Sequence, residues 1–505
     1  MKNAGRLYFV LASIFFSSTL LVESQSDKLL FVEPHRPKFH FSPQAHWMND
    51  PNGMIFYKGT YHLFFQYYPE ATVWGPMHWG HATSRDMVHW KEQSIKLYPD
   101  SLGYIFSGST VLDRDNSSEL GKPGIPPLVA IFTHHHPGKE KSGSPEFEYQ
   151  SLAYSTDEGS TWTKYMGNPV LKNPGLRDFR DPKVSWYAPG KKWIMTLAIG
   201  DRIGFYSSTN LKIWSEESEF GKNMGSHGGV WECPDLFALE YKRKKVWVLL
   251  VSINSGGPNG GSATQYFTGQ FDGKNFTPSD TTTRFIDYGT DNYAGVTFSN
   301  TGKRKVFMGW MSNWQYAQVV PTIRWRSAMT IPRELSITPV KNKLYLASTP
   351  VKEFRSKMKE KVVIKDLHVR DPYLVHDKIK TSPTSFSFQI STGAASDFSI
   401  ILGNPAGEKI SFGYNRSTNQ YFVDRTQAGK IDFHSDFGKI HYAPRLTSGP
   451  IHLTLIADAA SIEIFADHGL TVMTDIFFPN QPMNKLTIQS IEGIEIKKMI
   501  YHTIE

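Results

Sequence analysis

Three acidic residues in similar surroundings could carry out nucleophilic or acid–base chemistry. Asp50 lies within Trp-Met-Asn-Asp-Pro-Asn-Gly (47–53), Asp181 within Arg-Asp-Pro (180–182) and Glu232 within Trp-Glu-Cys-Pro (231–234). Hydrolysis of a glycosidic bond uses a pair of carboxyl groups, one to attack the anomeric carbon and one to protonate the departing oxygen. Asn-Asp-Pro-Asn-Gly and Arg-Asp-Pro are also good turn sequences, so the chemistry depends on whether the fold brings the acids together.

The elements that carry these acids are recurring pairs of β-type runs separated by a polar turn. The runs are rich in Val, Ile, Phe, Tyr and Trp, which favour strands. Five copies occur: Met54–Tyr67 turning at Lys58-Gly59, Gly108–Thr133 with a long polar insert, Lys183–Ile199 turning at Pro189-Gly190, Leu236–Ile253 turning at Lys242–Lys245, and Gly295–Met311 turning at Gly302. Each of the three acids stands just before one of these hairpins.

A second recurring element, ending in an aromatic residue, follows several hairpins. It occurs at Ser84–Trp90, Ser155–Trp162, Ser207–Trp214 and, more weakly, Phe271–Phe276. A hairpin plus an outer strand pair makes four strands per unit, which predicts a five-bladed β-propeller over residues 40–348. Because the innermost strand of each blade lines the central channel, we expect acids at the same end of three inner strands to meet in one funnel.

The chain beyond about Lys352 has a different texture, with short alternating strands that predict a β-sandwich over residues 362–505. The expected strands are Ser385–Ile390, Phe398–Leu402, Tyr421–Arg425, Ile451–Ala457, Ile462–Ala466 and Leu486–Ile491. The charged stretch Thr349–Lys361 is the predicted linker. No long stretch has sustained helical periodicity, so the predicted fold class is all-β.

The first 24 residues have the pattern of a secretory signal peptide. Lys2 and Arg6 precede an uncharged apolar run, Leu7–Val22, which is short for a membrane span and ends near small residues suited to cleavage. An uncleaved anchor is the alternative. We expect a secreted, extracellular protein with no membrane association after cleavage. Three N-x-S/T sequons in turn-like stretches are candidate glycan sites, at Asn116, Asn275 and Asn415.

Charge and cysteine content narrow the expected partners. The formal net charge of +8 is dispersed, and the densest basic stretch, Lys242–Lys245, is a predicted hairpin turn, which argues against a nucleic-acid partner. A single cysteine, Cys233, rules out an intramolecular disulfide. Because it has no evident partner base, we expect it to be a small filler beside Glu232 and not a nucleophile. The oligomeric state stays open.

The motifs around the acids resemble those of glycoside hydrolase family 32, which contains invertases, exo-inulinases and levanases. The resemblance rests on residues 47–53, Phe106-Ser107-Gly108-Ser109, 180–182, Glu232-Cys233-Pro234, 310–316, 422–425 and the region around 462–479. It extends over nearly the whole chain after the signal peptide. It implies a five-bladed propeller with a C-terminal β-sandwich and a retaining mechanism that uses no metal and no cofactor.

The resemblance also implies roles for individual residues. Asp50 is the expected nucleophile that forms a fructosyl-enzyme ester, Glu232 the acid/base, and Asp181 the residue that binds fructose hydroxyls and stabilises the transition state. Arg180 is expected to lie near Glu232 or the sugar and to tune charge there. Five further positions match family residues that line the fructose pocket: Asn49, Gln66, Trp74, Ser107 and Trp314. Blade packing is the alternative role for the two tryptophans.

The expected reaction is hydrolysis of terminal non-reducing β-fructofuranosyl residues from sucrose, and from raffinose and short inulin or levan chains. Two alternatives are transfructosylation, in which another sugar replaces water, and a catalytically silent fructan-binding propeller. The three intact acids disfavour the silent module.

Two further segments bear on the rim of the pocket and on metal binding. Asn292 stands where relatives usually carry an aromatic residue, so the sequence does not decide which side chains form the rim of the pocket. His134-His135-His136 is predicted to be a loop or rim of the second blade and not a metal site, because adjacent side chains on an extended segment point in different directions.

Overall fold

The computed structural model describes residues 33–375, 385–394 and 396–504, and the regular secondary structure of these residues is almost entirely β-strand. The predicted signal peptide, 1–24, lies outside these residues. Residues 33–36 belong to a separate unit and form a turn in which Arg36 pairs with Glu33 at 2.8 Å. Within the described ranges, no helix combines the length and the hydropathy needed to cross a bilayer.

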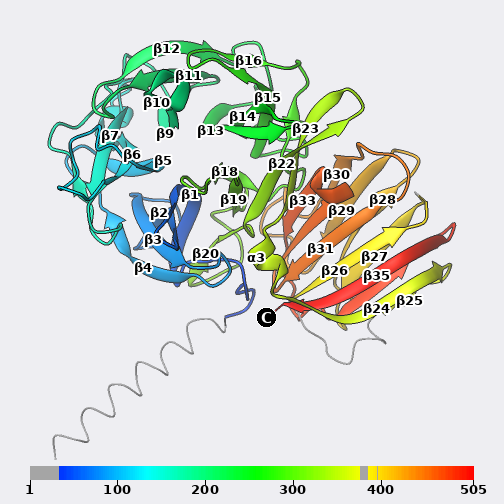
Figure 1. Ribbon diagram of the computed structural model, residues 1–505. Coiled ribbons are helices and arrows are strands. Elements are labelled where there is room, and N and C mark those ends of the chain that lie inside the picture. The colour runs from blue at the N-terminus through cyan, green and yellow to red at the C-terminus, as the bar shows by residue number, and fades with distance from the viewer. Residues whose placement is uncertain (1–32, 376–384, 395, 505) are drawn as a thin grey trace, which may run out of the picture. The chain divides into compact units, whose positions relative to one another are not determined.

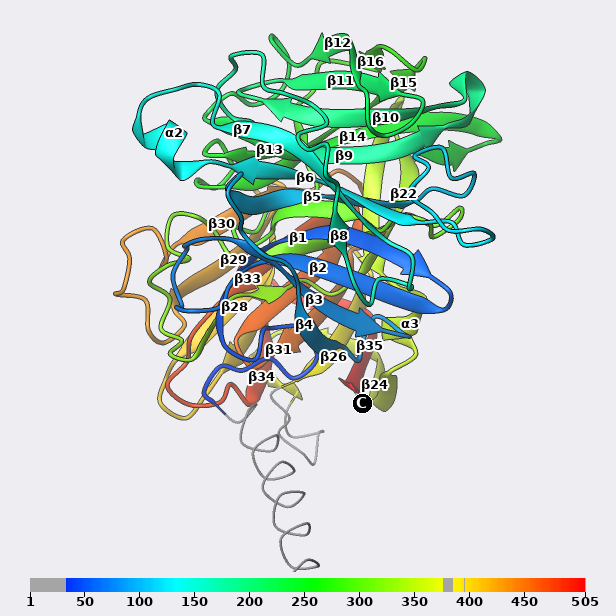
Figure 2. The same cartoon turned by 90° about the vertical axis from the view of Figure 1, so that its left-hand side faces the viewer.

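Residues 37 onward contain a five-bladed β-propeller, counted over the described residues (Figure 1). The first strand of each blade is innermost, and these strands contact one another in ring order, from β1 through β5, β9 and β13 to β18 and back to β1. In Figure 2, β1, β5 and β9 lie one above another. The predicted hairpins form the two inner strands of each blade, so the predicted propeller is confirmed.

The strands of each blade follow one another along the chain. Blade I contains β1 (His46–Tyr57), β2 (Thr60–Tyr68), β3 (His78–Ser84) and β4 (Lys91–Leu97), with β20 (Trp325–Arg326) parallel to β1. Blade II contains β5 (Tyr104–Leu112), β6 (Leu128–His135), β7 (Glu148–Ser155) and β8 (Thr163–Lys164). Blade III contains β9 (Phe179–Tyr187), β10 (Lys192–Ile199), β11 (Ile203–Ser208) and β12 (Ser215–Phe220).

The last two blades carry additional short strands. Blade IV contains β13 (Val230–Tyr241), β14 (Lys244–Asn254), β15 (Ala263–Phe271), β16 (Phe276–Pro278) and β17 (Arg284–Phe285). Blade V contains β18 (Tyr293–Thr297), β19 (Val306–Met311), β21 (Ala328–Met329), β22 (Arg333–Val340) and β23 (Lys343–Pro350). Backbone hydrogen bonds close the ring, from the Phe56 N–H to the Ser299 carbonyl at 3.0 Å and from the Ser299 N–H to the Met54 carbonyl at 2.9 Å.

The repeated aromatic-ended element is the turn between the third and fourth strands of a blade. In blades I to III the indole N–H of Trp90, Trp162 or Trp214 donates to a backbone carbonyl three residues earlier, at 3.0–3.1 Å. A serine and a following Asp or Asn cap the same turn through side-chain hydrogen bonds, as in Ser155 and Asp157 at 2.7 Å. The sequence repeat is therefore a repeated turn whose polar groups are satisfied locally.

The C-terminal part of the chain is a β-sandwich of two six-stranded sheets, counted over the described residues. One sheet has the order β24 (Met358–Val369), β35 (Ile494–Ile504), β26 (Phe386–Thr392), β31 (His452–Asp458), β32 (Ser461–Ala466) and β33 (Thr471–Ile476). The other has the order β25 (Tyr373–Leu374), β34 (Lys485–Gln489), β27 (Phe398–Gly403), β28 (Lys409–Asn415), β29 (Gln420–Gln427) and β30 (Ile440–Pro444).

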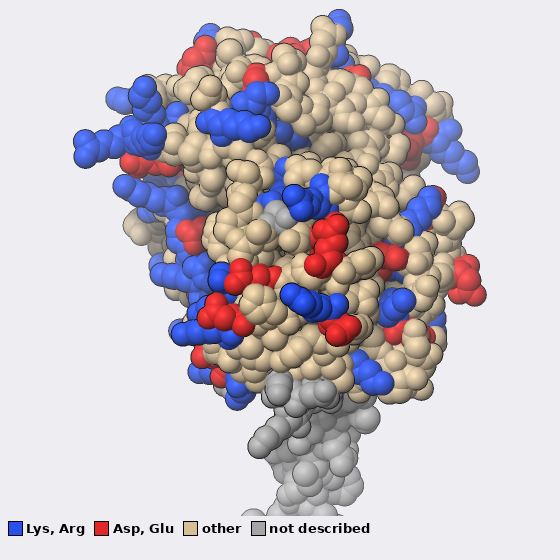
Figure 3. Space-filling view, turned by 90° about the vertical axis from the view of Figure 1, so that its right-hand side faces the viewer, with Lys and Arg blue, Asp and Glu red and all other residues tan. Residues whose placement is uncertain are grey.

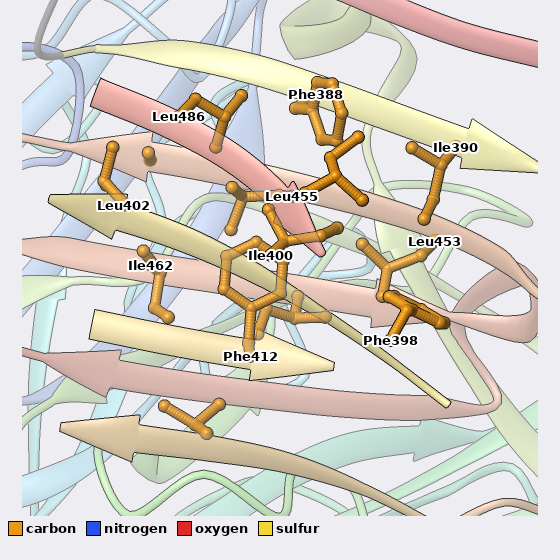
Figure 4. Packing of buried hydrophobic residues seen from close by; sticks show 14 of the residues in the cluster. Phe388, Ile390, Phe398, Ile400, Leu402, Phe412, Leu453, Leu455, Ile462 and Leu486 are labelled. Carbon is orange, nitrogen blue, oxygen red and sulfur yellow. The ribbon is translucent and has the colours of Figure 1, made fainter. Parts of the chain in front are cut away.

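Alternating apolar side chains from the two sheets fill the space between them. Figure 4 shows Phe388 and Leu455 from one sheet beside Ile400 and Phe412 from the other, and all four are buried. This packing explains why the short alternating runs predicted a sandwich. On the face shown in Figure 3, Lys and Arg side chains are mixed with Asp and Glu, as is usual for a solvated surface.

The segment predicted as a linker is more ordered than expected. β23 continues to Pro350, the short helix α3 spans Lys352–Arg355, and β24 begins at Met358. Among the strands of the described residues, β24 is an edge strand that pairs only with β35. Its many charged side chains suit an exposed edge and hide the strand pattern in the sequence.

A buried network of charged groups joins the propeller to the sandwich. The Arg333 guanidinium at the start of β22 contacts the carboxylates of Asp287, at 2.8 Å, and Glu463. The two ring nitrogens of His40 lie 2.8 Å from Asp458 and 2.8 Å from Glu463. All of these side chains are buried, so each charge depends on its partners for stability.

Candidate active site

One pocket of about 330 Å³ opens at the end of the propeller channel where β1, β5, β9 and β13 begin. All nine predicted site residues line it: Asn49, Asp50, Gln66, Trp74, Ser107, Arg180, Asp181, Glu232 and Trp314. They come from segments up to 265 positions apart, from 49 to 314. The propeller ring is what brings them to one place.

The inner strands share a β-bulge at the level of this pocket. The strand register shifts between Met48 and Pro51 on β1, between Ile105 and Gly108 on β5, between Arg180 and Lys183 on β9, and between Glu232 and Asp235 on β13. A bulge leaves residues unpaired and re-aims their side chains, and it tolerates proline because no ladder N–H is needed there. The Asp-Pro and Cys-Pro sequences are therefore parts of bulged strands and not turns.

Backbone conformation marks the same positions. Asp181 and Cys233 have φ angles of +66° and +45°, a region that residues with a Cβ rarely occupy. Hydrogen bonds hold both residues there, since the Asp181 N–H donates to Thr133 Oγ1 at 3.0 Å and the Cys233 N–H donates to Asp181 Oδ2 at 3.0 Å. Positive φ also occurs in ordinary turns of this chain, such as Lys58, but at Asp181 and Cys233 it falls within the bulges of β9 and β13.

Asp50 is surrounded by hydrogen-bond donors. Its Oδ1 accepts from Asn49 Nδ2 at 2.8 Å, and its Oδ2 accepts from Ser107 Oγ at 2.8 Å and from the Cys233 thiol at 3.3 Å. The indole N–H of Trp47 holds the Asn49 amide from behind, at 2.7 Å. The Asp50 carboxyl group therefore has a donor at each of its oxygens and is held in a fixed orientation in the lining of the pocket.

Asp181 interacts electrostatically with both of the other acids. Burial raises the pKa of its carboxyl well above the usual value, and the charges of Glu232 and Asp50 raise it further, whereas Arg180 lowers it. Cys233 thus contacts Asp50 and Asp181 together, through its thiol and its N–H.

Glu232 has two partners that hold its carboxyl group in place. Its Oε1 accepts from Nε and Nη2 of Arg180, both at 3.2 Å, and its Oε2 accepts from the Tyr293 hydroxyl. Burial raises the pKa of Glu232 and the charge of Asp50 adds to the rise, while Arg180 and Tyr293 oppose it. A carboxyl with a raised pKa keeps a proton that it can deliver to a leaving group.

Aromatic side chains form the wall and mouth of the pocket. Trp314 stacks on Trp47 at 5.8 Å between ring centroids, and Trp74 packs edge-on to Phe106 at 6.1 Å. Trp74 remains 37% exposed, so it has free surface for a ligand beyond its packing role. Rigid aromatic faces suit the C–H surfaces of a sugar, and the neighbouring amides and hydroxyls suit its oxygens.

Sequence reasoning missed several residues of the pocket. The further lining residues are Phe106, His135, Glu140, Phe147, Glu148, Asp178, Asn254 and Gln318, and Tyr293 reaches Glu232 from β18. Phe106 belongs to the matched Phe-Ser-Gly-Ser segment and Asp178 lies two residues before Arg180, so both could have been found. The others come from strand ends and loops that carry no repeated motif.

The prediction of a loop at the three adjacent histidines needs correction. His134 and His135 end the strand β6 and are not in a loop, and His135 lines the pocket. Their nitrogens face different partners, Ser151 Oγ at 2.7 Å and Glu148 Oε1 at 3.3 Å. Asn292 is buried, donates to Asp287 at 3.0 Å and is not among the residues that line the pocket.

A larger cavity of about 650 Å³ lies at the opposite ends of the same strands. Val111 on β5, Lys183 on β9 and Asp235 on β13 line it. The three acids of the candidate site are absent from its lining. The size of a cavity therefore does not identify the candidate active site, whereas the bulges that converge on the smaller pocket do.

A propeller channel that ends in a cluster of three carboxyl groups, aromatic walls and amide donors defines the class of the protein as a glycoside hydrolase. Comparison with protein families gives the same class. The model for "Glycosyl hydrolases family 32 N-terminal domain" matches residues 40–350, and that for "Glycosyl hydrolases family 32 C terminal" matches 351–502. The chain belongs to glycosyl hydrolase family 32.

Individual relatives agree with this assignment. The chain is 42% identical over 494 residues to a levanase of Bacillus subtilis, covering 95% of this chain and 72% of the relative. It is 38% identical to the extracellular exo-inulinase of Aspergillus niger, covering 89% and 90% of the two chains. These relatives are named for action on fructans.

Solved structures show the same fold. The exo-inulinase of Aspergillus awamori superposes with a TM-score of 0.85 at 34% identity, covering 94% of this chain and 99% of that one. A β-fructofuranosidase of Schwanniomyces occidentalis complexed with fructosyl-erythritol has a TM-score of 0.86 at 32% identity, covering 94% and 98%.

Proposed function

We propose that this chain is a secreted β-fructofuranosidase that removes terminal non-reducing β-D-fructofuranosyl residues with retention of configuration. The single observation that supports this best is that Asp50 and Glu232 line one sugar-sized pocket, with donors on the first and a raised pKa on the second. The two carboxyl groups thereby differ in the way that a nucleophile and an acid must differ.

In the first step of the proposed reaction, Asp50 Oδ attacks the anomeric carbon of the fructosyl residue while the bond to the leaving oxygen breaks. Glu232 gives its proton to that oxygen, so an alcohol departs and an ester to Asp50 forms. In the second step, the ionised Glu232 takes a proton from water, the water oxygen attacks the same carbon, and the Asp50 carboxylate leaves. Asp181 accepts hydrogen bonds from fructose hydroxyls as positive charge develops on the ring.

The proposed substrates are sucrose, raffinose and short inulin or levan chains. The names of the relatives support fructans, and the small pocket supports attack on one terminal residue at a time. Trp74 and Trp314 would pack against the sugar ring, and Gln66 and Asn49 would bind its hydroxyls.

Substitution of the two carboxyl residues tests the proposal. We expect Asp50→Ala and Glu232→Ala each to lower fructose release from sucrose by at least about a thousandfold, since each step needs both groups. Glu119→Ala, at a side chain that is 84% exposed, is the control and should act like the parent. Near-parental turnover by either pocket variant, with an unchanged circular dichroism spectrum, would overturn the assignment. A crystal structure is expected to show the two carboxyl groups about 5–5.5 Å apart.

Product analysis on sucrose, raffinose, inulin and levan separates hydrolysis from fructosyl transfer. Free fructose as the main product at low substrate concentration supports the hydrolase, and fructo-oligosaccharides as the main product would favour a transferase. The same digest ranks the four substrates.

The proposed secretion can be tested through the chain's termini and glycans. Asn275 and Asn415 are exposed, whereas Asn116 is partly buried and its Oδ1 accepts from the Gly121 N–H at 2.7 Å. In a host that glycosylates secreted proteins, we therefore expect higher glycan occupancy at Asn275 and Asn415 than at Asn116. Mass spectrometry of the secreted product would measure occupancy and show whether cleavage occurs near residue 24.

A further inference from the structure

The guanidinium of Arg180 is shared between Glu232 and a carboxylate from a different strand. Nε and Nη2 of Arg180 face Glu232 Oε1, both at 3.2 Å, while Nη1 lies 3.3 Å from each of the two carboxylate oxygens of Glu148. Asp178 Oδ1 accepts a hydrogen bond from the same Nη1 at 2.7 Å. A single positive charge therefore has three anionic partners, and Glu232 is one of them.

Glu148 is held firmly behind this arginine. It is the first residue of β7, its side chain is 1% exposed, and it lies directly across the strand pair from His135. His135 Nδ1 is 3.3 Å from Glu148 Oε1, and its Nε2 is 3.1 Å from Glu140 Oε2. Phe106 stacks on the His135 ring at 4.3 Å, which fixes the imidazole plane.

We propose that Glu148 is a positioning residue for the acid/base: by taking a share of the Arg180 guanidinium, it orients that group and limits the positive charge that acts on Glu232. This inference rests on the proposed role of Glu232 as the proton donor. Without Glu148 the arginine would favour ionised Glu232 more strongly, and the carboxyl would lose its proton at a lower pH.

The groups that face Glu232 support this balance. Arg180 approaches from β9 and Tyr293 from β18, and both favour the ionised carboxylate. Asp50 on β1 contributes negative charge that favours the protonated form of Glu232. Asp181 on β9 is the other acid that interacts with Glu232. Arg180 is thus the cation in contact with Glu232, and the charge it delivers depends on its other partners.

The pH dependence of kcat/KM for sucrose tests the proposal, because its alkaline limb reports deprotonation of the acid in the free enzyme. We expect Glu148→Gln to move this limb to lower pH by about 0.5–1 unit, from the loss of one nearby negative charge. Glu148→Asp, which keeps the charge, should leave the alkaline limb close to its parental position. Glu334→Gln is the matched control, since Glu334 pairs with Arg304 at 3.1 Å in blade V.

Asp178 provides a second variant if the buried Glu148→Gln chain fails to fold. Asp178 shares the same guanidinium nitrogen but its side chain is 24% exposed, so Asp178→Asn should fold and shift the alkaline limb in the same direction. Superimposable alkaline limbs for the folded variants and the parent, with activity reduced evenly at all pH values, would overturn the proposal.

Failure of this proposal and failure of the proposed function give different results. If Glu232→Ala is inactive and the Glu148 variants keep the parental limb, Glu232 remains the acid and only the role of Glu148 is wrong. If Glu232→Ala keeps parental activity, the acid itself has been misassigned, and a shift in the Glu148 variants would have to come from another group.

Discussion

Replacing Tyr293 by Phe should move the pH dependence of activity in the opposite direction from Glu148→Gln. Tyr293 is buried, and its hydroxyl donates to Glu232 Oε2, a bond that favours the ionised carboxylate. A hydrogen bond to a charged group contributes about 1.5–3 kcal/mol, and about 1.4 kcal/mol corresponds to one pKa unit. Loss of the hydroxyl should therefore raise the pKa of Glu232 by about 1 unit, given that Arg180 still binds the other oxygen.

The assay is the pH profile of kcat/KM for sucrose. In the proposed mechanism Glu232 must be protonated to act as the acid, so a higher pKa extends activity to higher pH and the alkaline limb should move up by about 1 pH unit. Tyr206→Phe is a matched control, because Tyr206 is buried in blade III on β11, and Glu232 is on β13. An unchanged or lowered alkaline limb in folded Tyr293→Phe would refute the reasoning.

Three other predictions concern stability and reactivity. Burial alone would lower the pKa of His40, but hydrogen bonds to Asp458 and Glu463 raise it from 6.5 to about 9. The protonated ring therefore stabilises the fold fully below about pH 6.5, and this contribution is lost as the pH rises through 9. Urea unfolding should show the parent losing on the order of 3 kcal/mol over that range and His40→Gln losing little. Arg333→Met leaves Glu463 buried and short of a partner, so it should cost about 3–5 kcal/mol by the same measurement; a cost under 1 kcal/mol would contradict this view of the network. Burial, with the nearby acids, raises the pKa of the Cys233 thiol, so iodoacetamide should alkylate it slowly in native protein and readily in urea, and equal rates would contradict its protected position.

The propeller could be predicted because each blade repeats a local pattern. Lys58 and Gly59 both have positive φ between β1 and β2, and Lys242 and Arg243 do so between β13 and β14, so turn residues marked the hairpins. Once the repeat is recognised, the ring brings Asp50, Asp181 and Glu232 together without any further information.

The supporting residues could not be predicted in the same way. Glu148 meets Arg180 because of the register between β6 and β7 and the contact between blades II and III, and neither is encoded in a short stretch of sequence. Tyr293 reaches Glu232 from a blade whose inner strand carries no acid at the matching position. The edge strand β24 was missed for another reason, since its charged side chains obscure alternation.

Residues of the pocket come from two kinds of segment, the bulged inner strands and the connections between strands. Asp50, Asp181 and Glu232 lie on the inner strands of the ring. Three other pocket residues lie in connections: Trp74 between β2 and β3, Glu140 in α2 (Pro137–Lys141), and Gln318 between β19 and β20. Insertions or substitutions in those connections can change which substrates enter the pocket without moving the three acids on the inner strands. Redesign for longer or branched fructans should therefore vary these three connections and leave the strand starts untouched.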